Sequence, residues 1–140
     1  MKFWDASAFV RLLIDQGLSE TFWNLAESDP KITVWWGTRV EGISALSRLE
    51  REGALDAKGV NEAADAMMAL IRNGLEMEPS EAIRDTAIRI LRTHPLRAAD
   101  AFQLAAALQA AEGKPATMDF VCTDAKLALA ASKEGFRILP

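Results

Sequence analysis

Four carboxylates stand where an α/β protein gathers its reactive side chains. Each follows a predicted strand or lies in the first turn of a predicted helix, and they are Asp5, Glu41, Asp100 and Asp124. The chain has one cysteine and one histidine, which excludes a zinc site built from those two residue types. Oxygen ligands suit a hard cation such as Mg²⁺ or Mn²⁺. Such a cation can generate hydroxide and stabilise a phosphodiester under attack, so metal-assisted phosphodiester hydrolysis is the leading interpretation.

Each of these acids also has a purely structural interpretation. Asp5 and Asp124 fit helix N-caps, whose side chains accept a backbone N–H from the next turn. Thr38 and Glu41 match a capping box, in which the glutamate reaches back to the backbone of the threonine. Asp100 would favour the positive end of its own helix.

The neighbours of two acids favour a functional role. Asp100 lies within the apolar run Ala98–Phe102, and Asp5 lies between Trp4 and Ala6, two residues before Ser7. Because burial of an unpaired carboxylate costs free energy, acids in such surroundings need a partner.

Short apolar runs alternate with Ala- and Leu-rich segments that have helical spacing. Strands are predicted over Lys2–Trp4, Ile32–Trp36, Phe120–Cys122 and Phe136–Leu139, with a possible minor strand over Leu75–Met77. Helices are predicted over Ala6–Gln16 (closed by Gly17), Ser19–Ser28, Thr38–Glu52, Asp56–Asn73, Ser80–Thr93, Ala98–Glu112 and Asp124–Glu134. This alternation predicts an α/β fold with three α/β/α layers and a parallel sheet of four or five strands. Ligands bind at the carboxyl edge of such sheets.

Composition narrows the class of protein. The chain of 140 residues is 50% hydrophobic and 26% charged, which is typical of one globular domain, here expected to span residues 1–140. A net charge of −4 excludes nucleic-acid binding by bulk charge, although a local cationic rim remains compatible with it. The sequence shows no signal-peptide run and no membrane span, and the lone Cys122 fits a reducing compartment, so we expect a cytoplasmic protein.

Four stretches resemble the motifs of PIN domains. Trp4–Val10 resembles the opening Asp-x-Ser-Ala motif, and Thr38–Leu46 resembles the glutamate motif. Leu96–Ala105 is similar to the Arg-Ala-x-Asp-Ala helix opening, and Phe120–Asp124 with Gly135–Leu139 resembles the closing strand–acid–helix–strand. Order, spacing and length match over nearly the whole chain. The sequence most resembles the VapC ribonuclease toxins of bacterial type II toxin–antitoxin pairs.

The resemblance implies a Mg²⁺- or Mn²⁺-dependent endoribonuclease that cuts RNA to inhibit translation and growth. Its metal-binding catalytic acids would be Asp5, Glu41, Asp100 and Asp124. Ser7 or Thr123 would orient a carboxylate or a water molecule. The resemblance further implies a cognate VapB-like antitoxin that occludes the site, and a homodimer.

The identity of the fourth acid has an alternative. The family often carries threonine two residues before its last acid, whereas Cys122 stands there in this chain and Thr123 is shifted by one. Asp119 is therefore the competing candidate. Asp124 is preferred because it lies at the exit of the predicted strand rather than at its entrance.

Two other classes of function remain open. One is a non-catalytic PIN-like module that binds RNA or protein. The other is a phosphatase of the haloacid-dehalogenase type, whose motif requires a second aspartate where this chain has Ser7. Among the remaining residues, Arg97 is the best candidate for an RNA contact or a structural ion pair. Trp35 and Trp36 are interpreted as core residues, and His94 as a helix-end residue.

Overall fold

The computed structural model describes residues 1–14 and 19–140. The predicted end of the first helix, with Gly17, lies outside the described residues. The strands are β1 (Lys2–Trp4), β2 (Ile32–Trp35), β3 (Leu75–Met77), β4 (Asp119–Val121) and β5 (Arg137–Leu139). The helices are α1 (Ala6–Leu13), α2 (Ser19–Glu27), α3 (Thr38–Arg51), α4 (Ala57–Asn73), α5 (Glu81–Thr93), α6 (Ala98–Ala110) and α7 (Ala125–Glu134). A 3₁₀ turn, η1 (Pro115–Thr117), lies between α6 and β4.

The strands form one parallel sheet in the order β3-β2-β1-β4-β5. The central strand β1 pairs with β2 on one side and β4 on the other, and Trp4 stands opposite Val121. Strand β3, which the sequence marked as a possible minor strand, pairs with β2 through Thr33 and Leu75. The chain therefore leaves β1, β2 and β4 at neighbouring points of the same sheet edge.

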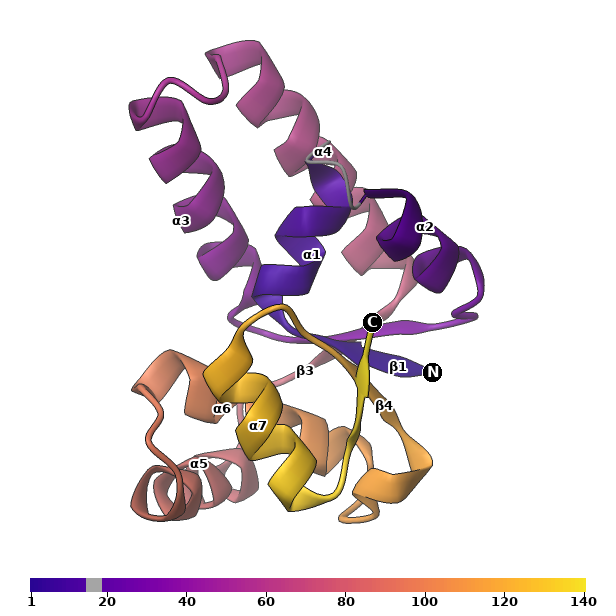
Figure 1. Ribbon diagram of the computed structural model, residues 1–140, viewed down its shortest axis with the longest axis vertical. Coiled ribbons are helices and arrows are strands. Elements are labelled where there is room, and N and C mark those ends of the chain that lie inside the picture. The colour runs from indigo at the N-terminus through magenta and orange to yellow at the C-terminus, as the bar shows by residue number, and fades with distance from the viewer. Residues whose placement is uncertain (15–18) are drawn as a thin grey trace.

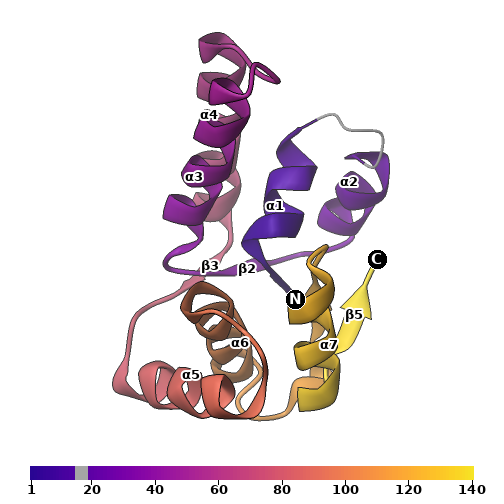
Figure 2. The same ribbon diagram turned by 60° about the vertical axis from the view of Figure 1, so that its left-hand side comes forward.

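Helices cover both faces of the sheet, as the sequence predicted (Figure 1). Figure 2 shows α1 to α4 on one side and α5 to α7 on the other. Side chains of a strand point alternately to the two faces. Accordingly, Phe3 packs in the core beneath α5 to α7, where its ring stacks on Phe120 at 5.5 Å, whereas Trp4 packs beneath α1, α2 and α4.

Three helices, α4, α5 and α7, begin one residue later than predicted, because the predicted first residue is an N-cap. Asp56 accepts a hydrogen bond from Gly59 N at 2.8 Å, and Ser80 accepts one from Ile83 N at 3.2 Å. Helix α7 ends at Gly135, whose φ of 110° lies in the left-handed region that glycine adopts readily. No helix within the described ranges has the length and apolar character needed to cross a membrane.

The interpretation of both adjacent tryptophans as core residues is wrong for one of them. Trp35 is buried, and its ring stacks on Phe102 at 5.4 Å. Trp36 is 52% exposed, since β2 ends at Trp35 and the next residue leaves the covered part of the sheet.

Candidate active site

Asp5 connects the central strand to the first helix. Its backbone N–H donates to Val121 O at 3.0 Å and so extends the pairing of β1 with β4 by one residue. Its side chain caps α1 by accepting the Ser7 N–H at 3.1 Å, and the Ser7 hydroxyl donates to the same carboxylate oxygen. The backbone of Thr123 donates to Ser7 Oγ at 3.3 Å. Ser7 thus connects the exit of β1 to the exit of β4.

Glu41 lies in the first turn of α3, which follows β2. The predicted capping box is wrong: Gly37 is the N-cap, without a side-chain hydrogen bond, and Thr38 is the first helical residue. Instead, Glu41 Oε2 accepts a hydrogen bond at 2.6 Å from the side-chain amide of Gln103. The Glu41 side chain therefore turns toward α6 and away from its own helix end.

The remaining two acids, Asp100 and Asp124, lie at the N-terminal ends of α6 and α7. Asp100 lies in the first turn of α6 and is half-buried. Asp124 caps α7 by accepting the Leu127 N–H at 2.9 Å. Both positions are helix starts at the carboxyl edge of the sheet, where backbone N–H groups favour an anion.

All four acids line one cavity of about 330 Å³. Ser7 and Thr123 line it as well, and so do two cations that the sequence analysis did not single out, Arg11 and Arg48. Arg48 follows Glu41 by seven residues, two turns along the same face of α3, and that spacing was a usable signal. The sheet edge thus brings together carboxylates that are as many as 119 positions apart in the chain (Asp5 to Asp124).

Burial and mutual repulsion alter the protonation of Asp5, Glu41 and Asp100. Burial, with a smaller contribution from Asp100, raises the pKa of Asp5 to about 6 against the hydrogen bonds from Ser7. Burial also raises the pKa of Glu41 to about 7, with added repulsion from Asp5 and Asp100. The pKa of Asp100 is raised by burial and by the charge of Asp124, and Arg97 lowers it in part. Raised carboxyl pKa values clustered in a cavity are typical of functional sites.

The donor set fits a hard divalent cation by its chemistry, because four carboxylates supply only oxygen ligands. Asp5 accepts a hydrogen bond from Ser7, and Glu41 accepts one from Gln103. Within residues 1–14 and 19–140, no three acid, histidine or cysteine side chains are already arranged to hold one ion. The four acids are therefore candidates for ligation by their chemistry and shared cavity.

Arg97 lines a second cavity, of about 560 Å³, rather than the first. That cavity shares Asp100 and Asp124 with the first one, and Lys126 also contributes to it. The two acids therefore have cations on either side, Arg48 in one cavity and Arg97 in the other. Cations on both sides of two acids suit contacts with consecutive phosphates of a nucleic-acid strand that lies across the acids.

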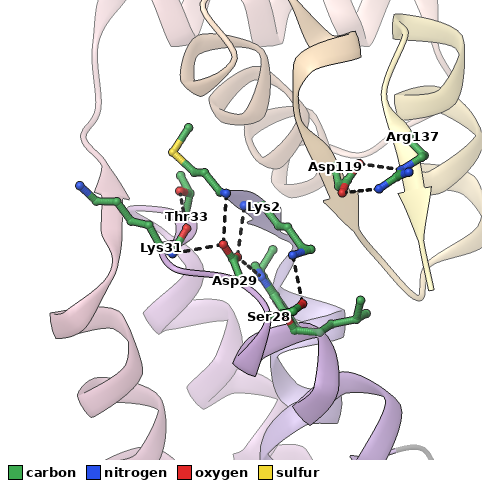
Figure 3. A network of polar contacts seen from close by, with 10 residues as sticks. Lys2, Ser28, Asp29, Lys31, Thr33, Asp119 and Arg137 are labelled. Atoms are coloured by element: carbon green, nitrogen blue, oxygen red, sulfur yellow. Dashed lines mark hydrogen bonds and ion pairs between the residues drawn. The ribbon is translucent and has the colours of Figure 1, made fainter.

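Asp119, the competing fourth acid, lies at the opposite edge of the sheet. It begins β4 opposite Lys2, and its carboxylate forms a two-pronged ion pair with Arg137 at 2.7 and 2.8 Å (Figure 3). The buried Asp29 lies near the same edge, where it accepts hydrogen bonds from the backbones of Lys2 and Lys31 at 3.1 and 3.2 Å. Both acids therefore contact residues at or near the amino ends of strands, at the sheet edge opposite the cavity.

Two buried residues beside the cavity were not assigned to the site from the sequence. Gln103 bonds to Glu41, and its signal was its position three residues after Asp100, on the same face of α6. Cys122 is buried, with Sγ 3.8 Å from Asp5 Oδ2. Burial raises the pKa of the Cys122 thiol to about 12, so it stays protonated and is no nucleophile at neutral pH.

His94 belongs to the structure of the domain rather than to the cavity. It ends α5 as predicted, is buried, and lies 2.8 Å from Glu134, which also pairs with Arg89. These two contacts hold α5 against the last residue of α7. The second position after Asp5 is Ser7, a hydroxyl donor, so the aspartate pair of a haloacid-dehalogenase phosphatase is not present there.

Comparison with known proteins supports the fold. No protein-family model matches the sequence, and no curated protein matches it. Among solved structures the chain is similar to FitAcB from Neisseria gonorrhoeae, with a TM-score of 0.68 over 100% of this chain and 97% of that one, at 15% sequence identity. At that identity the similarity concerns the fold. The chain therefore has a three-layer α/β/α fold of the PIN type, and the fold class expected from the sequence is confirmed.

Proposed function

We propose that the protein is a metal-dependent endoribonuclease of the PIN type and the toxin of a toxin–antitoxin pair. The observation that carries the proposal is the convergence of Asp5, Glu41, Asp100 and Asp124 on one cavity. The fold adds support, because FitAcB is a toxin–antitoxin complex whose toxin is a PIN domain. The quoted motifs favour the VapC type within that class.

In the proposed reaction, these four carboxylates would hold Mg²⁺ or Mn²⁺. When bound, the cation would lower the pKa of a water molecule and neutralise charge on the phosphodiester. Ser7 keeps the Asp5 carboxylate oriented and favours its charged form. Arg48 and Arg97, on the two sides of the acids, hold the phosphates that flank the reacting one. Thr123, which also lines the cavity, would orient water through its hydroxyl.

The proposed partners follow from this assignment. RNA is the substrate, and a VapB-like antitoxin is the inhibitor, whose segment would occlude the acid-lined cavity. We further propose that the protein forms a homodimer in the cytoplasm.

A cleavage assay tests the proposal. Purified chain is incubated with total cellular RNA in Mg²⁺, in Mn²⁺ and in EDTA, beside Asp5→Asn and Asp100→Asn variants whose folding is checked by circular dichroism. We expect cleavage by the wild type in either metal, and none in EDTA or by the variants. Cleavage that persists in EDTA would contradict the metal mechanism. Absence of cleavage of any RNA would favour a non-catalytic PIN-like binding module.

A second assay tests the toxin assignment. Expression of the chain in a bacterial host is expected to arrest growth, and co-expression of the product of a neighbouring gene is expected to relieve the arrest. The Asp100→Asn variant is the matched control and should be harmless. A wild type that cleaves RNA in vitro but leaves growth unaffected would point to a housekeeping nuclease.

A further inference from the structure

Gln103 is a fully buried polar side chain between α6 and α3. Its Nε2 donates to Thr38 Oγ1 at 3.1 Å and to Glu41 Oε2 at 2.6 Å, and the residue has no exposed surface. Its Oε1 is buried and has no hydrogen-bond partner among the described residues. The amide nitrogen thus donates two hydrogen bonds, whereas the amide oxygen accepts none from the described residues.

The ionised form of Glu41, which is the form that binds a cation, explains this orientation. An ionised carboxylate only accepts hydrogen bonds, so the amide must present Nε2 to it, and the reversed amide would place Oε1 against the carboxylate. The consequence is an unpaired buried carbonyl oxygen, which destabilises the fold. A leucine of similar size would avoid that loss. Packing therefore does not account for glutamine at this position, whereas the contact with Glu41 does.

We propose that Gln103 is a positioning residue, which fixes the Glu41 carboxylate in the cavity by binding Oε2 and leaves its other oxygen for the divalent cation. The inference rests on the proposed function and goes beyond it. Asp100 lies three residues before Gln103 on the same face of α6. One helix therefore supplies an acid to the cavity and also holds the acid that α3 supplies.

The test compares Gln103→Leu with a matched control on the same helix, Gln109→Leu, where the glutamine is exposed. If Gln103→Leu does not fold, Gln103→Met, which keeps an unbranched chain, replaces it under the same criteria. Two readouts are measured, one without metal and one with it, so that failure of the inference is distinguished from failure of the proposed nuclease.

The first readout is a double-mutant cycle in EDTA. We expect Gln103→Leu to lower the melting temperature more in the wild type than in a Glu41→Ala background, because the loss of the donor matters only while the carboxylate is present. Equal losses in the two backgrounds would overturn the inference, whatever the protein does with metal.

The second readout is the Mn²⁺ concentration that gives half of the metal-induced rise in melting temperature. We expect Gln103→Leu to require at least tenfold more Mn²⁺ than the wild type, and Gln109→Leu to match the wild type. An unchanged Mn²⁺ midpoint for Gln103→Leu overturns the positioning role. If Mn²⁺ does not raise the melting temperature of the wild type, the cation site and the proposed function are both overturned. In that case, a non-additive decrease in melting temperature in EDTA would still support the contact between Gln103 and Glu41.

Discussion

Asp5 Oδ2 accepts hydrogen bonds from both polar groups of Ser7, the backbone N–H at 3.1 Å and the side-chain hydroxyl. The first bond is the helix cap that any residue at position 7 except proline would make. The second needs a hydroxyl, and it opposes the effect of burial on the Asp5 pKa. Ser7 therefore supports both the local fold and the charged state of the acid.

Ser7→Ala is expected to raise the Asp5 pKa above its value of about 6, because the hydroxyl bond that favours the charged form is lost. A ligand must be deprotonated to bind metal, so the pH at which Mn²⁺ begins to stabilise the protein should shift upward. Melting curves with Mn²⁺ from pH 5.5 to pH 8 measure this shift. Ser44→Ala on the exposed face of α3 is the control, and an equal shift in both variants would contradict the role of Ser7.

Asp100→Asn is expected to melt at a higher temperature than the wild type in EDTA, because it removes a partly buried charge and its repulsion with Asp124. The gain should be below about 1 kcal/mol, since solvent screens a half-exposed group. A cation that binds only the folded wild type adds about 2.7 kcal/mol at a hundredfold excess over its dissociation constant. The same cation should raise the melting temperature of the Asp100→Asn variant only a little. If Asp100 acted only on its helix dipole, the variant would instead melt lower with and without metal.

Asp124→Asn should lower RNA cleavage by at least about 100-fold, if Asp124 is a ligand of the catalytic cation. Asparagine caps helices as well as aspartate does, so the variant should fold normally. Asp119→Asn is the matched comparison, because it removes only the ion pair with the exposed Arg137, which solvent screens and which lies away from the cavity. Loss of cleavage in Asp119→Asn, with activity kept in Asp124→Asn, would show that the fourth acid is Asp119.

Without metal, the stability of the fold is expected to decrease as the pH rises from about 4 to about 7. The pKa of Asp5 is raised from 3.8 to about 6 and that of Glu41 from 4.5 to about 7, so in this window the folded state binds more protons than the unfolded chain. The buried Asp5 alone contributes on the order of 3 kcal/mol to the decrease. Urea unfolding in EDTA at pH 4.5, 6 and 7.5 measures it, and Asp5→Asn should flatten the profile.

Replacing Arg97 and Lys126 together with alanine should weaken RNA binding and lower its salt dependence. For single strands, each lost phosphate contact reduces the slope of log affinity against log salt by about 0.7. The binding is measured in Ca²⁺ or EDTA with the Asp100→Asn variant as background, so that RNA is not cut. Lys58→Ala, on the exposed side of α4, is the control, and a salt slope unchanged by the double substitution would argue against a phosphate contact there.

Local pattern determined much of this protein. Apolar runs and glycine stops placed the parallel strands and the helices, because burial on both faces and helix termination are local chemical requirements. The same pattern placed Asp5 at the exit of a strand and Asp100 in the first turn of a helix, as the structure has them. The possible strand over Leu75–Met77 could be read from its apolar ends, although only its pairing with β2 makes it a strand.

Tertiary packing decided the rest. Whether Glu41 caps its own helix or turns to another one depends on Gln103, which lies 62 positions away in the chain. The environment of Trp36 depends on where β2 ends relative to the helices that cover the sheet. The elevated pKa values of Asp5 and Glu41 arise from burial and from charges on other elements. Hydrogen bonds, burial and repulsion between distant residues exist only once the sheet has brought their strands side by side, so no local pattern encodes them.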